Sequence, residues 1–153
     1  MIPDDPARFM PQEASYWLAR LCEANYRKLW RLLPNLMRPG SNTITSHVSV
    51  PTLHYTLLEQ APHTLTLHLT HLFEHENGHQ RLPDMRIRLY LDAEAAEVLE
   101  DCARPGVFAT FAHSGSPAEI LAYKWRMNYF LHRWLDFCLR QHDGLPDHGG
   151  VPS

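Results

Sequence analysis

The sequence has no long hydrophobic run and no excess of positive charge. No apolar stretch approaches the roughly 18–20 residues that a membrane-spanning helix requires. The 14 basic and 17 acidic residues give a formal net charge of −3, whereas a protein that binds nucleic acid through bulk electrostatics carries a clear positive surplus. We therefore expect neither a membrane nor a nucleic acid as the partner of this protein.

Sequence motifs of the common enzyme classes are also absent. The chain has no glycine-rich phosphate loop, no GxSxG, no HExxH and no CxxC. His113 and Ser114 are adjacent, but no partner acid stands at a diagnostic spacing, so we attribute the pair to chance. We expect a non-enzymatic protein that needs no cofactor.

The three cysteines, Cys22, Cys102 and Cys138, are an odd number without CxxC spacing. Two of them fall on apolar faces of predicted helices, and buried free thiols are typical of a reducing compartment. The N-terminus carries acids and prolines where a signal peptide would carry basic and then apolar residues. These features predict a cytoplasmic protein.

The remaining composition is that of a globular protein. Hydrophobic residues make up 44% and charged residues 20% of the 153 positions, which fits one domain with its own core. Prolines near the start predict a flexible lead over residues 1–11, and glycine and proline near the end predict a loose tail over residues 143–153. The single domain then spans residues 12–142.

Two segments carry apolar residues at helical spacing. The first runs from about residue 12 to residue 33 and is ended by Pro34, which lacks an amide proton. The second runs from about residue 118 to residue 141, after Ser116 as the N-cap and Pro117 as the first helical residue. We predict an amphipathic helix at each end of the domain.

Between the helices, apolar and polar residues alternate with a period of two. The alternation predicts strands over residues 44–50, 52–57 and 65–70, then a loop over 75–80 and a hairpin over 82–98. Such alternation is typical of antiparallel strands with one face in water. We therefore predict an α+β fold: an antiparallel β-sheet of about four to six strands flanked by N- and C-terminal helices packed on one face. The loop after the hairpin has room for a short strand at residues 107–111.

The register of the hairpin depends on where its turn lies. Residues 93–94 are the predicted turn, which places Tyr90 opposite Glu97 and Arg86 opposite Asp101.

Arg88, Tyr90 and Asp92 are the hairpin side chains best suited to binding. Arg88 and Tyr90 share the predicted face away from the helices. One interpretation is an exposed sheet face with paired charges, worth about 0.2–1 kcal/mol per pair. The other is a surface on which Arg88, Tyr90 and Asp92 recognise an anion or a protein partner, because arginine and tyrosine combine a large contact area with directed donors.

Three blocks of the chain carry a recognisable pattern. The first comprises Leu21, Cys22, Glu23, Asn25, Leu29, Arg31, Leu32, Leu33 and Pro34; the second Leu82, Pro83, Met85, Arg88, Leu89, Tyr90, Asp92, Ala93, Glu97 and Val98; the third Lys124, Asn128, Phe130, Leu131, Trp134, Leu135, Cys138 and Leu139. In these blocks the chain resembles the YqiB-like bacterial family of uncharacterised proteins. The resemblance implies no enzyme activity. Family members usually carry an acidic pair directly before the lysine, where this chain has Ala122 and Tyr123, and this departure puts in question any activity that requires the pair.

The histidines offer one geometric hypothesis. A turn at residues 50–51 would set His47 opposite His54, and a turn at residues 60–62 would set His54 opposite His68. Cross-strand neighbours lie about 4.5–5.5 Å apart at Cβ, so the three imidazoles could bind zinc or sense pH. The alternative is a solvated sheet face, since no acid or thiol completes the predicted row.

Asn25 and Asn128 lie on or beside the apolar stripes of the two helices. A buried amide without partners costs about 1–3 kcal/mol, so each asparagine needs hydrogen bonds. They either tie helix to sheet, or they line a polar pocket where the helices meet the sheet.

These observations favour a non-enzymatic binding or regulatory protein that acts through a protein–protein or anion-recognising surface. A protein partner or a homo-oligomer fits this interpretation, because four aromatic residues stand at or near the margins of the two helical stripes: Trp17, Trp30, Trp125 and Tyr129. The alternative is a small-molecule-binding protein or minor enzyme with a pocket near Asn25 and Asn128.

Overall fold

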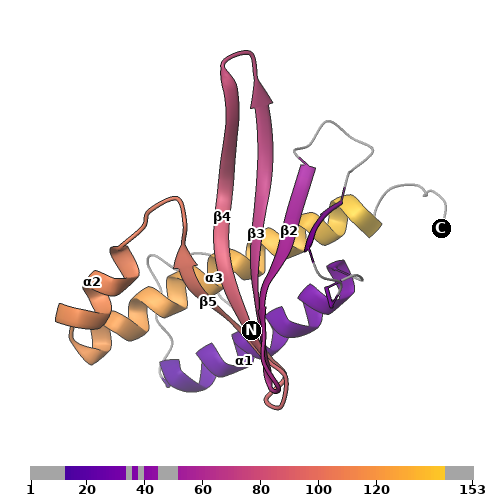
Figure 1. Cartoon of the computed structure of the whole chain (residues 1–153). Helices are drawn as coiled ribbons and strands as arrows, with labels where there is room; N and C mark the ends of the chain where they lie inside the picture. Colours follow the sequence, from indigo (N-terminus) through magenta and orange to yellow (C-terminus); the bar gives the residue numbers. More distant parts are fainter. Residues whose placement is uncertain (1–12, 34–35, 38–39, 45–51, 144–153) are drawn as a thin grey trace.

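The computed structural model describes residues 13–33, 36–37, 40–44 and 52–143 (Figure 1). The predicted lead, the tail beyond residue 143, His47 and most of the first predicted strand lie outside the described residues. The elements in chain order are α1 (Ala14–Leu32), β1 (Gly40–Ile44), β2 (Thr52–Gln60), β3 (Thr64–His75), β4 (Gly78–Tyr90), β5 (Ala95–Asp101), α2 (Val107–Ser114) and α3 (Pro117–Asp143).

The five strands form one antiparallel sheet in which each strand pairs with its neighbours in the sequence, in the order β1-β2-β3-β4-β5. β3 and β4 make a long hairpin that extends beyond the helices (Figure 1). The predicted α+β fold, an antiparallel sheet with N- and C-terminal helices, is confirmed. The periodicity also placed the two long helices within about two residues of their observed bounds.

α1 and α3 pack against each other and share one core with the sheet. The core joins helical residues to the alternate residues of the strands: Leu29 and Leu32 from α1, Leu131 and Leu135 from α3, and Leu65, Leu67, Leu69, Met85, Ile87 and Leu89 from β3 and β4. An ion pair between Lys28 Nζ and Asp136 Oδ1, 2.7 Å apart, also joins the helices. None of the helices in the described part of the chain is long and apolar enough to cross a membrane.

Trp125 and Tyr129 do not form a surface patch. Both are buried, with Leu21 of α1, in a second hydrophobic cluster. The apolar stripe of α3 is therefore wide because it packs against two partners, the sheet and α1.

Two local predictions were wrong. Residues 107–111 belong to the helix α2, in which Thr110 donates its backbone N–H to the carbonyl of Gly106, and Phe108 packs beside Tyr123 of α3. Residues 75–80 are not a loop, because β3 continues to His75 and β4 begins at Gly78. Gly78 has a φ of +127°, which glycine adopts without strain, so the turn needs few residues.

The register between β2 and β3 also differs from the predicted one. His54 pairs with Thr70, and His68 pairs with Thr56, so His54 and His68 are not directly opposite. The turn between the strands comprises residues 61–63, later than predicted, and the register shifts at Leu58.

The predicted register between β4 and β5 was wrong for a similar reason. Tyr90 pairs with Ala95 rather than Glu97, and Arg86 pairs with Glu100 rather than Asp101. The turn holds four residues, 91–94, instead of two, and the register shifts again at Leu99. Each such bulge inserts one residue that alternation alone does not reveal.

Candidate ligand-binding site

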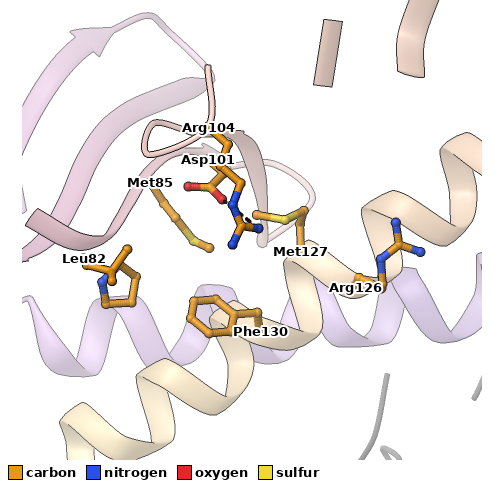
Figure 2. A pocket seen from close by; sticks show the side chains of 8 residues that line it. Leu82, Met85, Asp101, Arg104, Arg126, Met127 and Phe130 are labelled. Carbon is orange, nitrogen blue, oxygen red and sulfur yellow. Dashed lines mark ion pairs between the residues drawn. The ribbon is translucent and has the colours of Figure 1, made fainter. Parts of the chain in front are cut away.

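A pocket with a volume of about 460 Å³ lies between α3, β4 and the turn that follows β5 (Figure 2). Its lining residues are Leu82, Pro83, Met85, Asp101, Arg104, Arg126, Met127 and Phe130. Ligand pockets typically measure about 300–1,000 Å³ and combine apolar walls with a few polar groups. The volume of the pocket falls within this range, and its lining includes both apolar and charged side chains.

The apolar wall comes from two elements. Met85 belongs to the core-facing side of β4, and Met127 and Phe130 lie on neighbouring turns of α3. Figure 2 shows Met85, Met127 and Phe130 around a common space, with Leu82 beside them. Leu82 is 47% exposed and Phe130 is 45% exposed, so two large apolar side chains at the pocket mouth contact solvent.

The polar lining residues are Asp101, Arg104 and Arg126; Figure 2 shows Asp101 and Arg104 side by side, with Arg126 apart from them beyond Met127. Asp101 accepts a hydrogen bond from the Ala103 backbone N–H at 3.1 Å, and its other oxygen lies 4.0 Å from Arg104 Nη1 (Figure 2). The guanidinium of Arg126 lies 5.9 Å from the centre of the Tyr123 ring. The lining thus holds one carboxylate and two arginines, of which Arg104 pairs with Asp101, and these charges sum to one positive charge.

The shift of register at Leu99 brings Asp101 to this pocket. Ile87 pairs with Val98, both core-facing, but Met85 pairs with Asp101 after one extra residue in β5. Because a shift of one residue exchanges the two faces of a strand, Asp101 lies on the side of Met85. Burial and then the charge of Asp101 raise the pKa of the neighbouring Tyr123.

Asn25 and Asn128 are fully buried and contact each other. Asn25 Nδ2 donates to the backbone carbonyl of Asn128 at 3.0 Å, joining α1 to α3. Asn128 Oδ1 accepts the backbone N–H of Val98 at 2.9 Å, and its Nδ2 donates to the carbonyl of Lys124 at 2.8 Å. The two amides thus link α1, α3 and β5, and neither lines the pocket in Figure 2.

Arg88 is partly exposed and has partners within the protein. Its Nε donates to Thr66 Oγ1 at 3.1 Å, and its Nη2 lies 3.7 Å from a carboxylate oxygen of Glu59. Asp92, at the tip of the hairpin, lies 3.2 Å from His63 Nδ1. Charges on this face are therefore paired at Arg88, whereas the recognition surface stays a prediction.

Tyr90 belongs to a chain of contacts that reaches α3. Its hydroxyl donates to Glu97 Oε1 at 3.3 Å, and Glu97 Oε2 lies 3.1 Å from Lys124 Nζ. Burial and then the charge of Glu97 raise the pKa of Tyr90. Glu97 therefore meets Tyr90 diagonally, although the two residues are not paired in register.

His68 has an acid and a thiol beside it, contrary to the prediction that neither was available. Its Nε2 contacts Asp84 Oδ1, and Cys102 lies close to both. Burial and then the charge of Asp84 raise the pKa of the Cys102 thiol to about 11. The three cysteines are free thiols, and Cys22 and Cys138 are buried as predicted.

Sequence reasoning missed Arg104 and Arg126, which stand in a turn and on the exposed side of a helix, where arginine is ordinary. The apolar lining residues had a signal, since Leu82, Pro83, Met85 and Phe130 all belong to the pattern shared with the YqiB-like family.

Comparisons with known proteins give a family but no activity. A family model described as a protein of unknown function, DUF1249, matches residues 28–144. The chain is 34% identical over 125 residues to the uncharacterized protein YqiB of Escherichia coli K12, over 80% of this chain and 86% of the relative. YqiB of Escherichia coli O157:H7 matches with the same identity and coverage. No solved structure matches the chain significantly.

Proposed function

This chain belongs to the DUF1249 family of proteins of unknown function, and we propose that it is a non-enzymatic binding protein whose ligand is a small amphipathic anion. The observation that carries the proposal is the pocket between α3 and β4, whose lining combines apolar side chains with two arginines. The ligand would place an apolar body on Phe130 and Met127 and an acidic group near Arg104 and Arg126.

Hydrophobic burial and charge would both contribute to such binding. Each methylene group removed from water contributes about 0.8 kcal/mol. Arg104 is largely exposed, so its contribution is screened, and we expect about 1 kcal/mol from it. Affinity would then depend mainly on the apolar walls, whereas the preference for an anion would depend on the two arginines.

Isothermal titration with decanoate, decylamine and decanol tests the proposal. We expect decanoate to bind more tightly than the other two, which share its chain but not its charge. Arg104→Gln and Arg126→Gln should each weaken decanoate binding by about fivefold, which corresponds to about 1 kcal/mol. Arg140→Gln, a change of an exposed arginine elsewhere on α3, is the matched control and should leave the affinity unchanged.

Phe130→Ser tests the apolar wall, because Phe130 is half exposed and its replacement should not unfold the protein. We expect it to weaken all three ligands equally. Equal affinities for decanoate and decylamine, or equal effects of Arg104→Gln and Arg140→Gln, would contradict the anion site.

A protein partner or a second copy of the chain is the second candidate occupant, favoured by the exposed Leu82 and Phe130 at the pocket mouth. Sedimentation of the purified protein over a range of concentrations tests self-association. A Phe130→Ser variant that stays monomeric where the parent dimerises would support it, and a parent that is monomeric throughout would exclude it.

We also propose that the protein works in the bacterial cytoplasm, without a membrane or nucleic-acid partner. The free thiols and the bacterial relatives support the compartment. The negative net charge speaks against nucleic acid.

A further inference from the structure

We propose that His68, Asp84 and Cys102 bind a divalent transition-metal ion, with zinc as the best match, independently of the anion site. The three residues offer one ring nitrogen, one carboxylate oxygen and one thiol sulfur, all within 4.8 Å of one another. Atoms bound to one tetrahedral zinc at 2.0–2.3 Å lie about 3.3–3.8 Å apart. Small side-chain rotations would therefore let the three atoms share one ion.

The sheet fixes the positions of two of these side chains. Asp84 of β4 pairs with Thr70 of β3, and His68 lies two residues before Thr70, on the same face of that strand. This is the face away from the helices, because Leu67 and Leu69 point into the core. The histidine and the carboxylate thus meet diagonally across a strand pair, held by backbone hydrogen bonds on both sides.

Cys102 reaches the same face because β5 contains an extra residue. The Cys102 backbone N–H donates to the Asp84 carbonyl at 2.7 Å, so Cys102 continues the pairing of β5 one residue beyond its end. Without the register shift at Leu99, Cys102 would point to the helix side. The shift therefore places the thiol beside the His68–Asp84 pair.

The ligand set points to the class of metal. Magnesium and calcium prefer sites built from oxygen alone, and copper(I) prefers soft sulfur ligands. Zinc accepts imidazole, thiolate and carboxylate together, and three protein ligands leave the fourth position for water or another ligand. The His68 side chain is 25% exposed and that of Asp84 is 15% exposed, which leaves an approach from solvent.

An ordinary His–Asp ion pair in the same sheet provides a comparison. His63 and Asp92 lie 3.2 Å apart at the hairpin ends, but they are 73% and 80% exposed, and no cysteine joins them in the described residues. His68 and Asp84 are mostly covered and have a thiol within ligand distance. The proposal therefore predicts metal binding at the covered pair and none at the exposed pair.

Titration of the untagged, reduced full chain with cobalt(II) tests the site. Cobalt binding should produce visible bands of tetrahedral coordination and a near-ultraviolet thiolate charge-transfer band, and zinc should displace it. His68→Gln, Asp84→Asn and Cys102→Ser should each weaken binding by at least about tenfold, and Cys102→Ser should remove the charge-transfer band. Circular dichroism should show that each variant remains folded.

Two matched controls keep the test specific. Cys22→Ala removes a different thiol, and His63→Gln removes the histidine of the exposed pair, so both should bind cobalt as the parent does. Zinc should also raise the thermal midpoint of the parent but not that of Cys102→Ser. Cobalt binding without a charge-transfer band, binding that survives in all three ligand variants, or no binding at millimolar cobalt would overturn the proposal.

Discussion

Asn128 is a residue at which three elements, α1, α3 and β5, are joined by hydrogen bonds. Its side chain accepts the N–H of Val98 from β5 and donates within α3, while its backbone carbonyl accepts from Asn25 of α1. Asn25 and Asn128 are fully buried, as are the hydrogen bonds to Val98 and between the two asparagines, and in such a place an unmade hydrogen bond costs more than a made one contributes. The arrangement predicts different costs for the two asparagines.

Asn128→Ala should lower the free energy of unfolding by about 2–3 kcal/mol, because the buried N–H of Val98 loses its acceptor. Asn25→Ala should cost only about 1 kcal/mol. The Asn25→Ala change takes the Asn25 Nδ2 donor away from the Asn128 carbonyl, which is a loss. It also removes the buried Asn25 Oδ1, which lacks a hydrogen-bond partner among the described residues, and this partly offsets the loss. Urea unfolding of both variants measures the difference, and equal or reversed costs would show that Asn128 is not the central link.

His71 predicts a dependence of stability on pH. It is buried beside Trp134, whose Nε1 donates to His71 Nδ1 at 3.1 Å, and its Nε2 lies 3.7 Å from Cys138 Sγ. Burial lowers its pKa from 6.5 to about 4, while burial raises the pKa of Cys138 to about 12, so the thiol stays protonated. Below pH 6.5 the unfolded chain therefore binds a proton that the folded chain does not, and stability falls until about pH 4.

The variant His71→Gln separates this effect from other titrations, because glutamine can accept from Trp134 without gaining charge. Between pH 7 and pH 5 the parent should lose about 2 kcal/mol more stability than the variant. Urea midpoints at the two pH values give the comparison. An equal loss of stability in the parent and in the variant would show that His71 takes up a proton as easily in the folded protein as in the unfolded chain.

At the scale of elements, α3 begins as its sequence predicts. Ser116 Oγ accepts the N–H of Glu119 at 3.1 Å, and Glu119 Oε1 accepts the N–H of Ser116 at 2.8 Å, which is a capping box. Ser116→Ala should therefore cost about 1 kcal/mol of stability. Ser114→Ala, which removes a hydroxyl bonded to the carbonyl of Thr110 in α2, is the matched control and should cost less. A loss as large in the control would argue against the capping role.

The strands show how far sequence alone can lead. Alternation identified which face of β3 and β4 is buried, because each side chain of a strand points opposite to the next. It could not give the register, since Leu58 and Leu99 are single inserted residues whose apolar side chains fit either face. The insertion at Leu58 and the turn before β3 set His68 opposite Thr56 rather than His54, and the insertion at Leu99 brings Cys102 beside the His68–Asp84 pair.

At the scale of the whole molecule, the pocket could not be predicted from the chain. Its residues come from three segments, β4, the turn after β5 and α3, and their approach depends on how α3 crosses the end of the sheet. Periodicity predicted that α3 packs on the sheet, but it carries no information about where the helix leaves apolar surface uncovered. Leu82 and Phe130 look like ordinary members of a strand and a stripe until the fold is known.

The central claim is that this pocket binds an amphipathic anion, and its two methionines allow the most direct test. In protein labelled with methyl-¹³C methionine, Met85 and Met127 report on the pocket, whereas Met37 lies outside it. Titration with decanoate should shift the methyl signals of Met85 and Met127 saturably and leave Met37 unchanged, and the same concentrations of decylamine should produce smaller shifts. Unchanged Met85 and Met127 signals, or equal shifts with decanoate and decylamine, would contradict the account.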